Sequence, residues 1–117
     1  MKLVTKEVEK RLEKFPIRSQ ENVENKKVLV KFFIGSCTWI VTEAEKMENG
    51  DWEFFGWVNL GYGGEWGYFR LSEFADVKVP IRLGNIVFGY ANVEREQYEH
   101  YGNGYVVNFN GEIHCEK

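Results

Sequence analysis

Four side chains in the sequence could hold a transition metal, namely Cys37, His100, His114 and Cys115. Zinc sites usually combine ligands that lie two to five residues apart. His114 and Cys115 are adjacent, so an extended backbone points them to opposite faces, and His100 lies fourteen residues upstream of His114 without a nearby partner. We therefore expect no metal and no cofactor.

A nucleophilic enzyme needs a serine, cysteine or threonine beside an activating base. Ser36 and Cys37 stand in a predicted turn, but neither histidine lies in a recognisable catalytic motif. Carboxylate pairs such as Glu43 and Glu45 are abundant, and in an acidic chain such groups are normally solvated. The sequence therefore predicts a protein that is not an enzyme.

The stretch GYGGEWG, residues 61–67, has the glycine content of a phosphate-binding loop. The dinucleotide fingerprint G-x-G-x-x-G requires a glycine where this stretch has Trp66, and it joins a strand to a helix, whereas this stretch joins two predicted strands. The chain also lacks a Gly-Lys-Ser or Gly-Lys-Thr triplet. A turn between strands is therefore the better interpretation of these glycines.

The first element that the sequence predicts is a short N-terminal helix. Thr5 can cap it, and Val8, Leu12 and Phe15 recur at the spacing of one helical face. Pro16 ends it, because the residue before a proline resists helical geometry.

Four strands with short connections follow and predict an antiparallel meander. In the first of them, Val28, Val30, Phe32 and Ile34 alternate with their neighbours, which is the period of a half-buried strand. The pair Asn49–Gly50 is a strong hairpin signal. The four strands are predicted at 27–35, 38–45, 52–60 and 65–71.

Shorter elements are expected after the meander. Ser72 can cap a helical turn, the segment between Pro80 and Gly84 reads as a loop, and residues 85–90 form a fifth strand. A second short helix is predicted at 92–101, with Asn92 as its cap, and a last strand at 104–111, with Asn110–Gly111 as a turn.

These elements predict an α+β fold in which the N-terminal helix packs on an antiparallel β-meander of about five strands, with the second short helix in a C-terminal extension. A chain of 117 residues has the length of one domain. We expect a single domain over 1–117, made of a core over 1–90 and an extension over 91–117.

Aromatic side chains alternate along the third and fourth strands, so that Phe55, Trp57, Trp66, Tyr68 and Arg70 should share one sheet face. This face could be core covered by the helix or the extension, a hot spot for a protein partner, or a surface that stacks bases. Interface hot spots favour Trp, Tyr and Arg, so we expect these five residues to contact a partner.

Charge divides the chain unevenly. Residues 1–31 carry nine Lys/Arg and five Glu, a balance of +4, whereas residues 32–117 carry six Lys/Arg and thirteen Asp/Glu, a balance of −7. Most such charge is solvated surface. The sharper interpretation is that Glu94, Glu96 and Glu99 form an acidic patch that meets a basic partner.

The cellular compartment is expected to be the cytoplasm. The N-terminus MKLVTKEVEK lacks the apolar core of a signal peptide, and no apolar run approaches the ~18 residues that a membrane span needs. The two cysteines form no CxxC pair, and free thiols are the usual state in a reducing compartment.

Several stretches of the chain together carry a family resemblance, namely Leu3–Glu7, Val30–Phe33, Trp39, Thr42–Glu43, Phe54–Gly56 and Gly67–Phe74. They resemble one small bacterial family, known as domain of unknown function 2958. Residues 77–85 lack the Arg-Gly and Gly-Leu-Pro elements associated with that family, and 90–117 looks like an extension. The resemblance implies a compact α+β domain, often carried on plasmids, phages and other mobile elements, with no assigned catalytic residue.

The function expected from all of this is a non-catalytic binding module of a mobile element or phage. It would bind a protein partner, such as a basic nucleic-acid-binding protein of the host. One role for this binding is inhibition of a host defence system of the CRISPR or restriction type, by analogy with other accessory proteins of such elements. One alternative is a protein that binds or sequesters a nucleotide-like small ligand. A second alternative is weak nucleic-acid binding through the basic residues 2–31.

Overall fold

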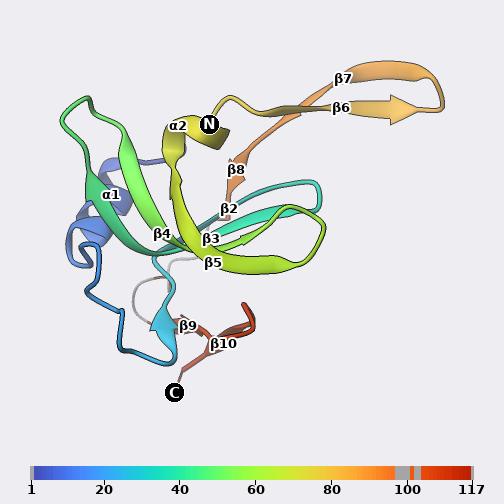
Figure 1. Ribbon diagram of the computed structural model, residues 1–117. Helices are drawn as coiled ribbons and strands as arrows, with labels where there is room; N and C mark the ends of the chain where they lie inside the picture. The colour runs from blue at the N-terminus through green and yellow to red at the C-terminus, as the bar shows by residue number, and fades with distance from the viewer. Residues whose placement is uncertain (1, 97–100, 102–103, 117) are drawn as a thin grey trace.

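The computed structural model describes residues 2–96, 101 and 104–116. Its centre is a five-stranded antiparallel sheet in the order β5-β4-β3-β2-β8 (Figure 1). One helix, α1 (Lys6–Glu13), packs against it, so the predicted α+β class is confirmed. The five strands are β2 (Val30–Ile34), β3 (Cys37–Lys46), β4 (Trp52–Asn59), β5 (Gly64–Arg70) and β8 (Glu94–Arg95).

The helix α1 has the cap that the sequence predicts. The Thr5 hydroxyl accepts a hydrogen bond from the backbone N–H of Val8 at 3.3 Å, which satisfies one of the free amides of the first turn. Val8 and Leu12 are buried, and the helix ends at Lys14, shortly before Pro16.

The four-stranded meander is confirmed together with its turns. Gly50 between β3 and β4 has a φ of 88°, and Gly61 and Gly63 between β4 and β5 both have a φ of 99°. A positive φ is the conformation that glycine adopts without strain, so the turns form where the glycines stand.

The ladder between β3 and β4 contains a β-bulge that the sequence did not predict. Val41 pairs with Gly56 and Glu43 pairs with Phe55, so Thr42 is the extra residue. An extra residue shifts the alternation of a strand by one position. As a result, Glu43 lies on the same sheet face as Phe55.

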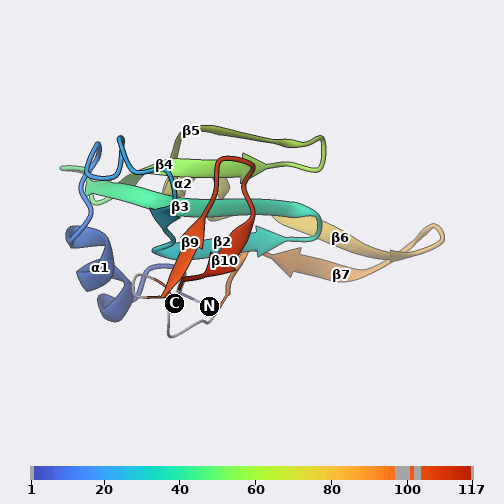
Figure 2. The same ribbon diagram turned by 90° about the horizontal axis from the view of Figure 1, so that it is seen from below.

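The two faces of the sheet are covered differently. One face carries the main core, with Phe32, Phe54 and Phe74 packed ring against ring beneath α1 and the short helix α2 (Leu71–Phe74). A smaller three-stranded sheet crosses the other face (Figure 2). Its strands are β1 (Lys26–Lys27), β9 (Tyr105–Val107) and β10 (Ile113–Cys115), which pair in the order β1-β9-β10.

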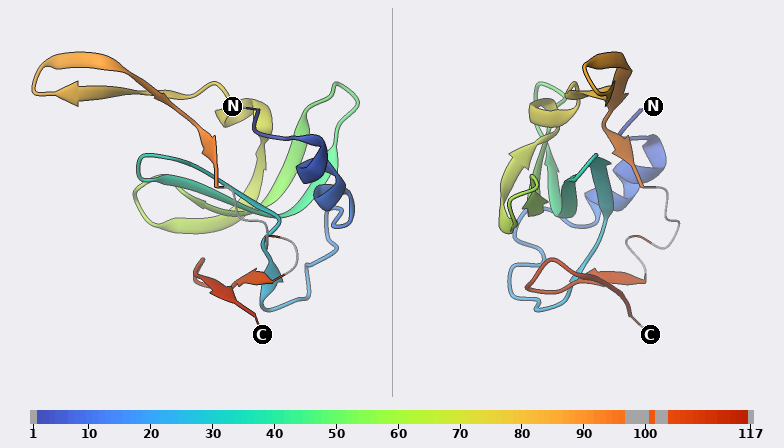
Figure 3. Two further views of the ribbon diagram at one scale, coloured as in Figure 1. Left: turned by 180° about the vertical axis from the view of Figure 1, so that it is seen from behind. Right: turned by 90° about the vertical axis from the view of Figure 1, so that its right-hand side faces the viewer.

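A two-stranded hairpin projects away from this body, as the three views agree (Figures 1 and 3). It consists of β6 (Lys78–Leu83) and β7 (Ile86–Asn92), which form a separate sheet. The predicted loop between Pro80 and Gly84 is therefore wrong, because Pro80 lies within β6 and the turn consists of Gly84 and Asn85. A proline is compatible with a strand that has a free edge. We call residues 78–92 the arm.

The expected positions of the shorter elements also need correction. A second short helix exists as α2, whereas residues 92–95, where the sequence placed its start, are the end of β7 and the strand β8. Residues 97–100 of that prediction lie outside the described residues. The strand predicted at 85–90 exists as β7, but it belongs to the arm, and the fifth strand of the central sheet is β8, which pairs with β2. Arg70, and not Ser72, is the N-cap of α2.

No helix among the described residues is long and apolar enough to cross a membrane.

Candidate functional site

Four of the predicted contact residues meet on the outer face of β4 and β5. Phe55 pairs with Tyr68 and Trp57 pairs with Trp66 across the ladder. The rings of Phe55 and Trp66 are nearly parallel, with an angle of 15° and centroids 6.0 Å apart. Tyr68 is tilted by 60° with its centroid 4.9 Å from that of Phe55. The alternation of the strands thus creates one continuous aromatic surface.

Trp57 is partly covered by the C-terminal segment. Its indole packs against Gly64 of β5 and against Gly111 in the turn between β9 and β10, so closely that a Cβ on either glycine would come within 2.2 Å of it. It also packs against the buried cluster of Val28, Ile40 and Val107. The C-terminal segment therefore covers this end of the aromatic face in part.

Trp66 is only half covered by the same C-terminal turn. Its indole Nε1 donates a hydrogen bond to the backbone carbonyl of Phe109 at 3.0 Å. The ammonium of Lys26 lies 5.9 Å from the ring centroid, within the range of a cation–π contact. Tyr68 is 59% exposed. The covering sheet thus stops in the middle of the aromatic surface.

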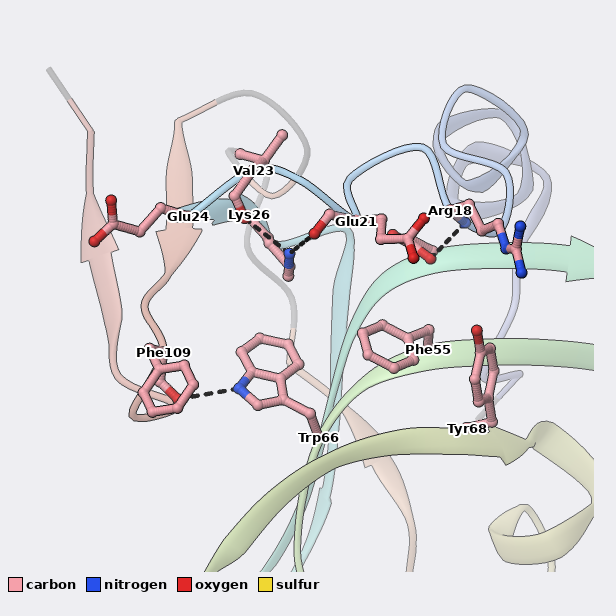
Figure 4. A pocket seen from close by; sticks show the side chains of 10 residues that line it. Arg18, Glu21, Val23, Glu24, Lys26, Phe55, Trp66, Tyr68 and Phe109 are labelled. Carbon is pink, nitrogen blue, oxygen red and sulfur yellow. Dashed lines mark hydrogen bonds between the residues drawn. The ribbon is translucent and has the colours of Figure 1, made fainter.

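A pocket of about 360 Å³ lies where the covering sheet stops. Figure 4 shows Phe109, Trp66, Phe55 and Tyr68 following one another along it, with Lys26 and Arg18 on its upper side. This volume lies at the lower end of the range for small-molecule sites. Ten residues line it: Arg18, Glu21, Val23, Glu24, Lys26, Glu43, Phe55, Trp66, Tyr68 and Phe109.

The pocket contains one buried carboxylate. Glu43 is 2% exposed, and its two oxygens accept the backbone N–H groups of Arg18 at 2.7 Å and Gln20 at 3.0 Å. No ion pair within the described part of the chain reaches Glu43. The expectation that Glu43 is solvated is therefore wrong, because the bulge at Thr42 places it on the face of Phe55, where the loop with Arg18 and Gln20 covers it and two of its amides hydrogen-bond the carboxylate.

The loop between α1 and β1 forms the upper wall of the pocket and is fixed by buried polar contacts. The side-chain amide nitrogen of Gln20, Nε2, donates hydrogen bonds to the backbone carbonyls of Lys27 at 3.0 Å and Thr42 at 2.7 Å. The side-chain oxygen of Gln20, Oε1, accepts a hydrogen bond from the backbone N–H of Lys27 at 2.7 Å. The Lys26 ammonium donates to three backbone carbonyls of the loop. These bonds give the wall a defined shape.

Arg18 stands in this wall in an unusual backbone conformation. Among the described residues other than glycine, Arg18 is the one with a positive φ, which is 79°. A left-handed backbone costs free energy in any residue with a Cβ and persists where the surroundings hold it. Here the carboxylate of Glu43 holds the Arg18 amide, and the guanidinium reaches over the end of the pocket near Tyr68 (Figure 4).

The other predicted contact residues lie elsewhere. Arg70 faces Glu53 with 3.8 Å between Nε and Oε2 at the far end of β5. Glu94 is exposed on β8, and Glu96 forms an ion pair with Lys31 at 3.2 Å. Glu99 lies outside the described residues. Because β5 and β8 are opposite edges of the central sheet, Glu94 is not part of the aromatic pocket.

Seven of the ten pocket residues were missed at the level of the sequence, among them Glu43, Phe109 and Arg18. Glu43 depends on the bulge, and Phe109 is brought to the pocket by a hairpin 43 residues downstream of Trp66. Arg18 lies in a segment that reads only as a polar loop. No local pattern in the sequence predicts that these residues lie at the pocket.

The metal-ligating candidates are not gathered in the described part of the chain. Within it, no group of three or more His, Cys, Asp or Glu side chains could hold a metal ion. His114 lies 3.1 Å from the Asn108 amide, measured from Nε2 to Nδ2, and Cys37 and Cys115 are free thiols. His100 lies outside the described residues. What the described site offers chemically is stacking, one acceptor group and nearby charge.

Comparison with known proteins places the chain in a family. The model of DUF2958, described as a protein of unknown function, matches residues 3–95. The chain belongs to this family. The DUF2958 match includes 77–85, the stretch that seemed to depart from the family pattern, and it includes every pocket residue except Phe109. No curated protein and no solved structure matches the chain.

Proposed function

We propose that this protein is a non-catalytic binding module that docks onto another protein through its arm, the hairpin of β6 and β7. The observation that carries this proposal is the apolar surface that the arm leaves bare. Large apolar side chains along it are 39% to 69% exposed, which is unusual for residues of this type. These are Val79, Ile81, Leu83, Ile86, Val87, Phe88 and Tyr90.

The register of the arm sorts its side chains into two faces. Val79, Ile81 and Leu83 alternate with Lys78, Pro80 and Arg82 along β6, so they share one face. Their cross-strand neighbours on β7 are Ala91, Gly89 and Ile86. One face is therefore entirely apolar. The other carries both positive charges of the arm together with Val87 and Tyr90, which pair with Arg82 and Pro80.

The arm has no packed layer of its own. It pairs with no other strand of the described chain, and it lies outside both buried clusters except for Ala91 at its base. A lone two-stranded hairpin is at best marginally stable in water, since neither face is removed from solvent. A partner that covers the apolar face would stabilise the hairpin and bury this surface in one step.

The charge of the arm indicates the chemistry of the partner. Lys78 and Arg82 give it a charge of +2, and it has no acidic residue, whereas the remainder of the chain has a charge of −5. We therefore expect an apolar partner surface with acidic side chains at its rim. The family context of mobile elements makes a host defence protein one partner of this kind, and we propose the cytoplasm as the compartment.

The experiment compares partner capture by three forms of the protein. The arm variant carries Leu83→Lys and Ile86→Lys, at side chains 69% and 61% exposed, so the fold of the body should not change. The matched control carries Leu60→Lys and Tyr62→Lys, two exposed side chains of the β4–β5 turn. Each form is used to capture partners from bacterial lysate, and the captured proteins are identified by mass spectrometry.

We expect a partner that the wild type and the control capture and that the arm variant loses. Capture should also weaken as salt is added, because the rim contacts are electrostatic. The same captured proteins for all three forms would overturn the proposal. A concentration-dependent dimer in sedimentation experiments that only the arm variant loses would also overturn it, since the arm would then serve a second copy.

A further inference from the structure

The aromatic pocket is independent of the arm, and its chemistry defines a ligand. We propose that it binds a planar, nitrogen-containing aromatic ring of the nucleobase type, with guanine as the best match. In this mode the ring stacks along Phe55, Trp66 and Tyr68 and donates hydrogen bonds to the carboxylate of Glu43.

The stacking surface is the first ground. Phe55 and Trp66, from two neighbouring strands, present nearly parallel rings to the pocket, and Tyr68 adds a tilted ring next to Phe55. Flat aromatic platforms on β-sheets bind bases because every base has a π-face. The pocket has room for one bicyclic ring with a substituent, not for a large cofactor.

The buried carboxylate of Glu43 is the second ground. Each of its oxygens accepts a single backbone N–H, although a carboxylate oxygen can accept two hydrogen bonds. An ionised carboxylate only accepts, so the ligand must supply donors. Guanine presents two adjacent donors, the ring N1–H and the N2 amino group, whereas adenine presents one amino group on the corresponding edge. A ligand that lacks one of these donors leaves a carboxylate oxygen of Glu43 without a partner. Buried polar sites discriminate between similar ligands in this way.

The charges around the pocket are the third ground. The Lys26 ammonium is occupied by three carbonyls, and it lies over Trp66. The guanidinium of Arg18 makes no hydrogen bond or ion pair with any described residue and can reach a phosphate. Glu21 and Glu24 at the rim carry negative charge, so the higher charge of a nucleoside diphosphate or triphosphate is disfavoured. The ligand class is therefore a guanine nucleoside or monophosphate.

Titration of the full chain with guanosine, GMP, inosine and adenosine tests the proposal. Binding is measured by calorimetry and by NMR shifts of the Trp66 indole N–H and of the Arg18 and Gln20 amides. We expect guanosine and GMP to bind and to shift these three signals. Inosine, which lacks the N2 amino group, and adenosine should bind more weakly. Tighter binding of GMP than of guanosine would assign the phosphate to Arg18, and equal binding would assign recognition to the base alone.

Two tyrosine variants separate the pocket from the rest of the surface. Tyr68→Ala removes an exposed ring from the platform, and we expect about tenfold weaker guanosine binding, the usual effect of losing one stacking contact. Tyr62→Ala removes a tyrosine that is 97% exposed and does not line the pocket, and binding should not change. Glu43→Gln, where NMR shows it to be folded, should remove the preference for guanosine over inosine.

The arm variant Leu83→Lys/Ile86→Lys should bind guanosine as the wild type does, which keeps this test separate from that of the protein partner. The proposal is overturned if guanosine and GMP do not bind at millimolar concentration, or if Tyr68→Ala binds guanosine unchanged. Binding of tetramethylammonium or of a tryptophan-containing peptide without any binding of guanosine would also overturn it. Those results would assign the pocket to an organic cation or to a partner side chain.

Discussion

Gly111 packs directly on the indole of Trp57. A Cβ atom on Gly111 would lie 2.1 Å from Cε2 of that ring, a distance that real atoms do not reach. Gly111 also has a φ of 80°, which lets the chain turn between β9 and β10. A single residue thus both forms the C-terminal hairpin and allows it to rest on the central sheet. This contact decides how much of the aromatic surface is covered.

The first prediction concerns Gly111→Ala. We expect it to lower the free energy of unfolding more than Gly63→Ala does, by about 1–3 kcal/mol, because the new methyl group overpacks the indole of Trp57. Gly63 is the matched control, since it also has a positive φ but has no atom within 4 Å of its would-be Cβ. Urea unfolding of the wild type, Gly111→Ala and Gly63→Ala measures how much free energy of unfolding each variant loses. Equal losses would show that the contact with Trp57 contributes nothing.

The local elements of the fold could be predicted from the sequence because their causes are local. Thr5 caps its helix within one turn, and Asn49–Gly50 forms its hairpin between adjacent strands. Of the two strands of the arm, β7 was predicted and β6 was missed. Pro80 in β6 indicates a loop because a proline cannot donate to a second neighbouring strand, and only the tertiary structure shows that β6 has a free edge. The helix predicted from 92 failed at its start because strand pairing of Glu94 and Arg95 with β2 overrides a weak helical pattern.

The candidate site was predictable only in part. Strand alternation places Phe55, Trp66 and Tyr68 on one face, so these three residues could be found without a structure. The role of Glu43 could not, because a bulge leaves no clear local signal and yet changes which face a side chain takes. Covering of Trp57 also depends on a contact between distant segments. Composition alone cannot distinguish a half-covered face from an open one.

The second prediction concerns the loop that forms the pocket wall. Glu43→Gln replaces one acceptor oxygen by an amide NH2 group, which only donates, so one of the two backbone N–H groups bound by Glu43 loses its acceptor. We expect a loss of about 1–3 kcal/mol in the free energy of unfolding, the cost of one unpaired buried group. Hydrogen exchange of the Arg18 and Gln20 amides should accelerate. Glu45→Gln, at an exposed position of the same strand, is the control and should change neither quantity. If these two amides exchanged at the same rate in Glu43→Gln as in the wild type, the carboxylate of Glu43 would not be what holds the loop in place.

The third prediction concerns acid. Asp51 joins the β3–β4 turn to α2, because its carboxylate accepts the Ser72 hydroxyl at 2.6 Å and the Ser72 N–H at 3.1 Å. Partial burial raises the pKa of Asp51, but these bonds, the N–H of Trp52 and the charge of Arg70 outweigh it and lower the pKa below its ordinary value. The folded chain therefore takes up this proton less readily than the unfolded chain.

Asp51 thus stabilises the fold above the unfolded pKa of about 3.9, and the contribution is lost as the pH falls through the lower folded value. Wild type and Asp51→Asn are compared by urea unfolding at neutral pH and at about pH 2.5, well below that unfolded value. We expect the wild type to be the more stable form at neutral pH and the difference to shrink in acid. A difference that stays constant with pH would show that the charge of Asp51 has no part in it.

The fourth prediction concerns the arm before any partner binds. Its strands have only each other, so the amides of β6 and β7 should exchange with solvent much faster than those of β3, which pairs on both sides within the central sheet. Native-state hydrogen exchange measures this directly. Protection of the arm that equals that of β3 would contradict an unpartnered hairpin. If that protection disappeared on dilution, a second copy of the chain would be covering the apolar face, because only an intermolecular contact weakens as the protein concentration falls.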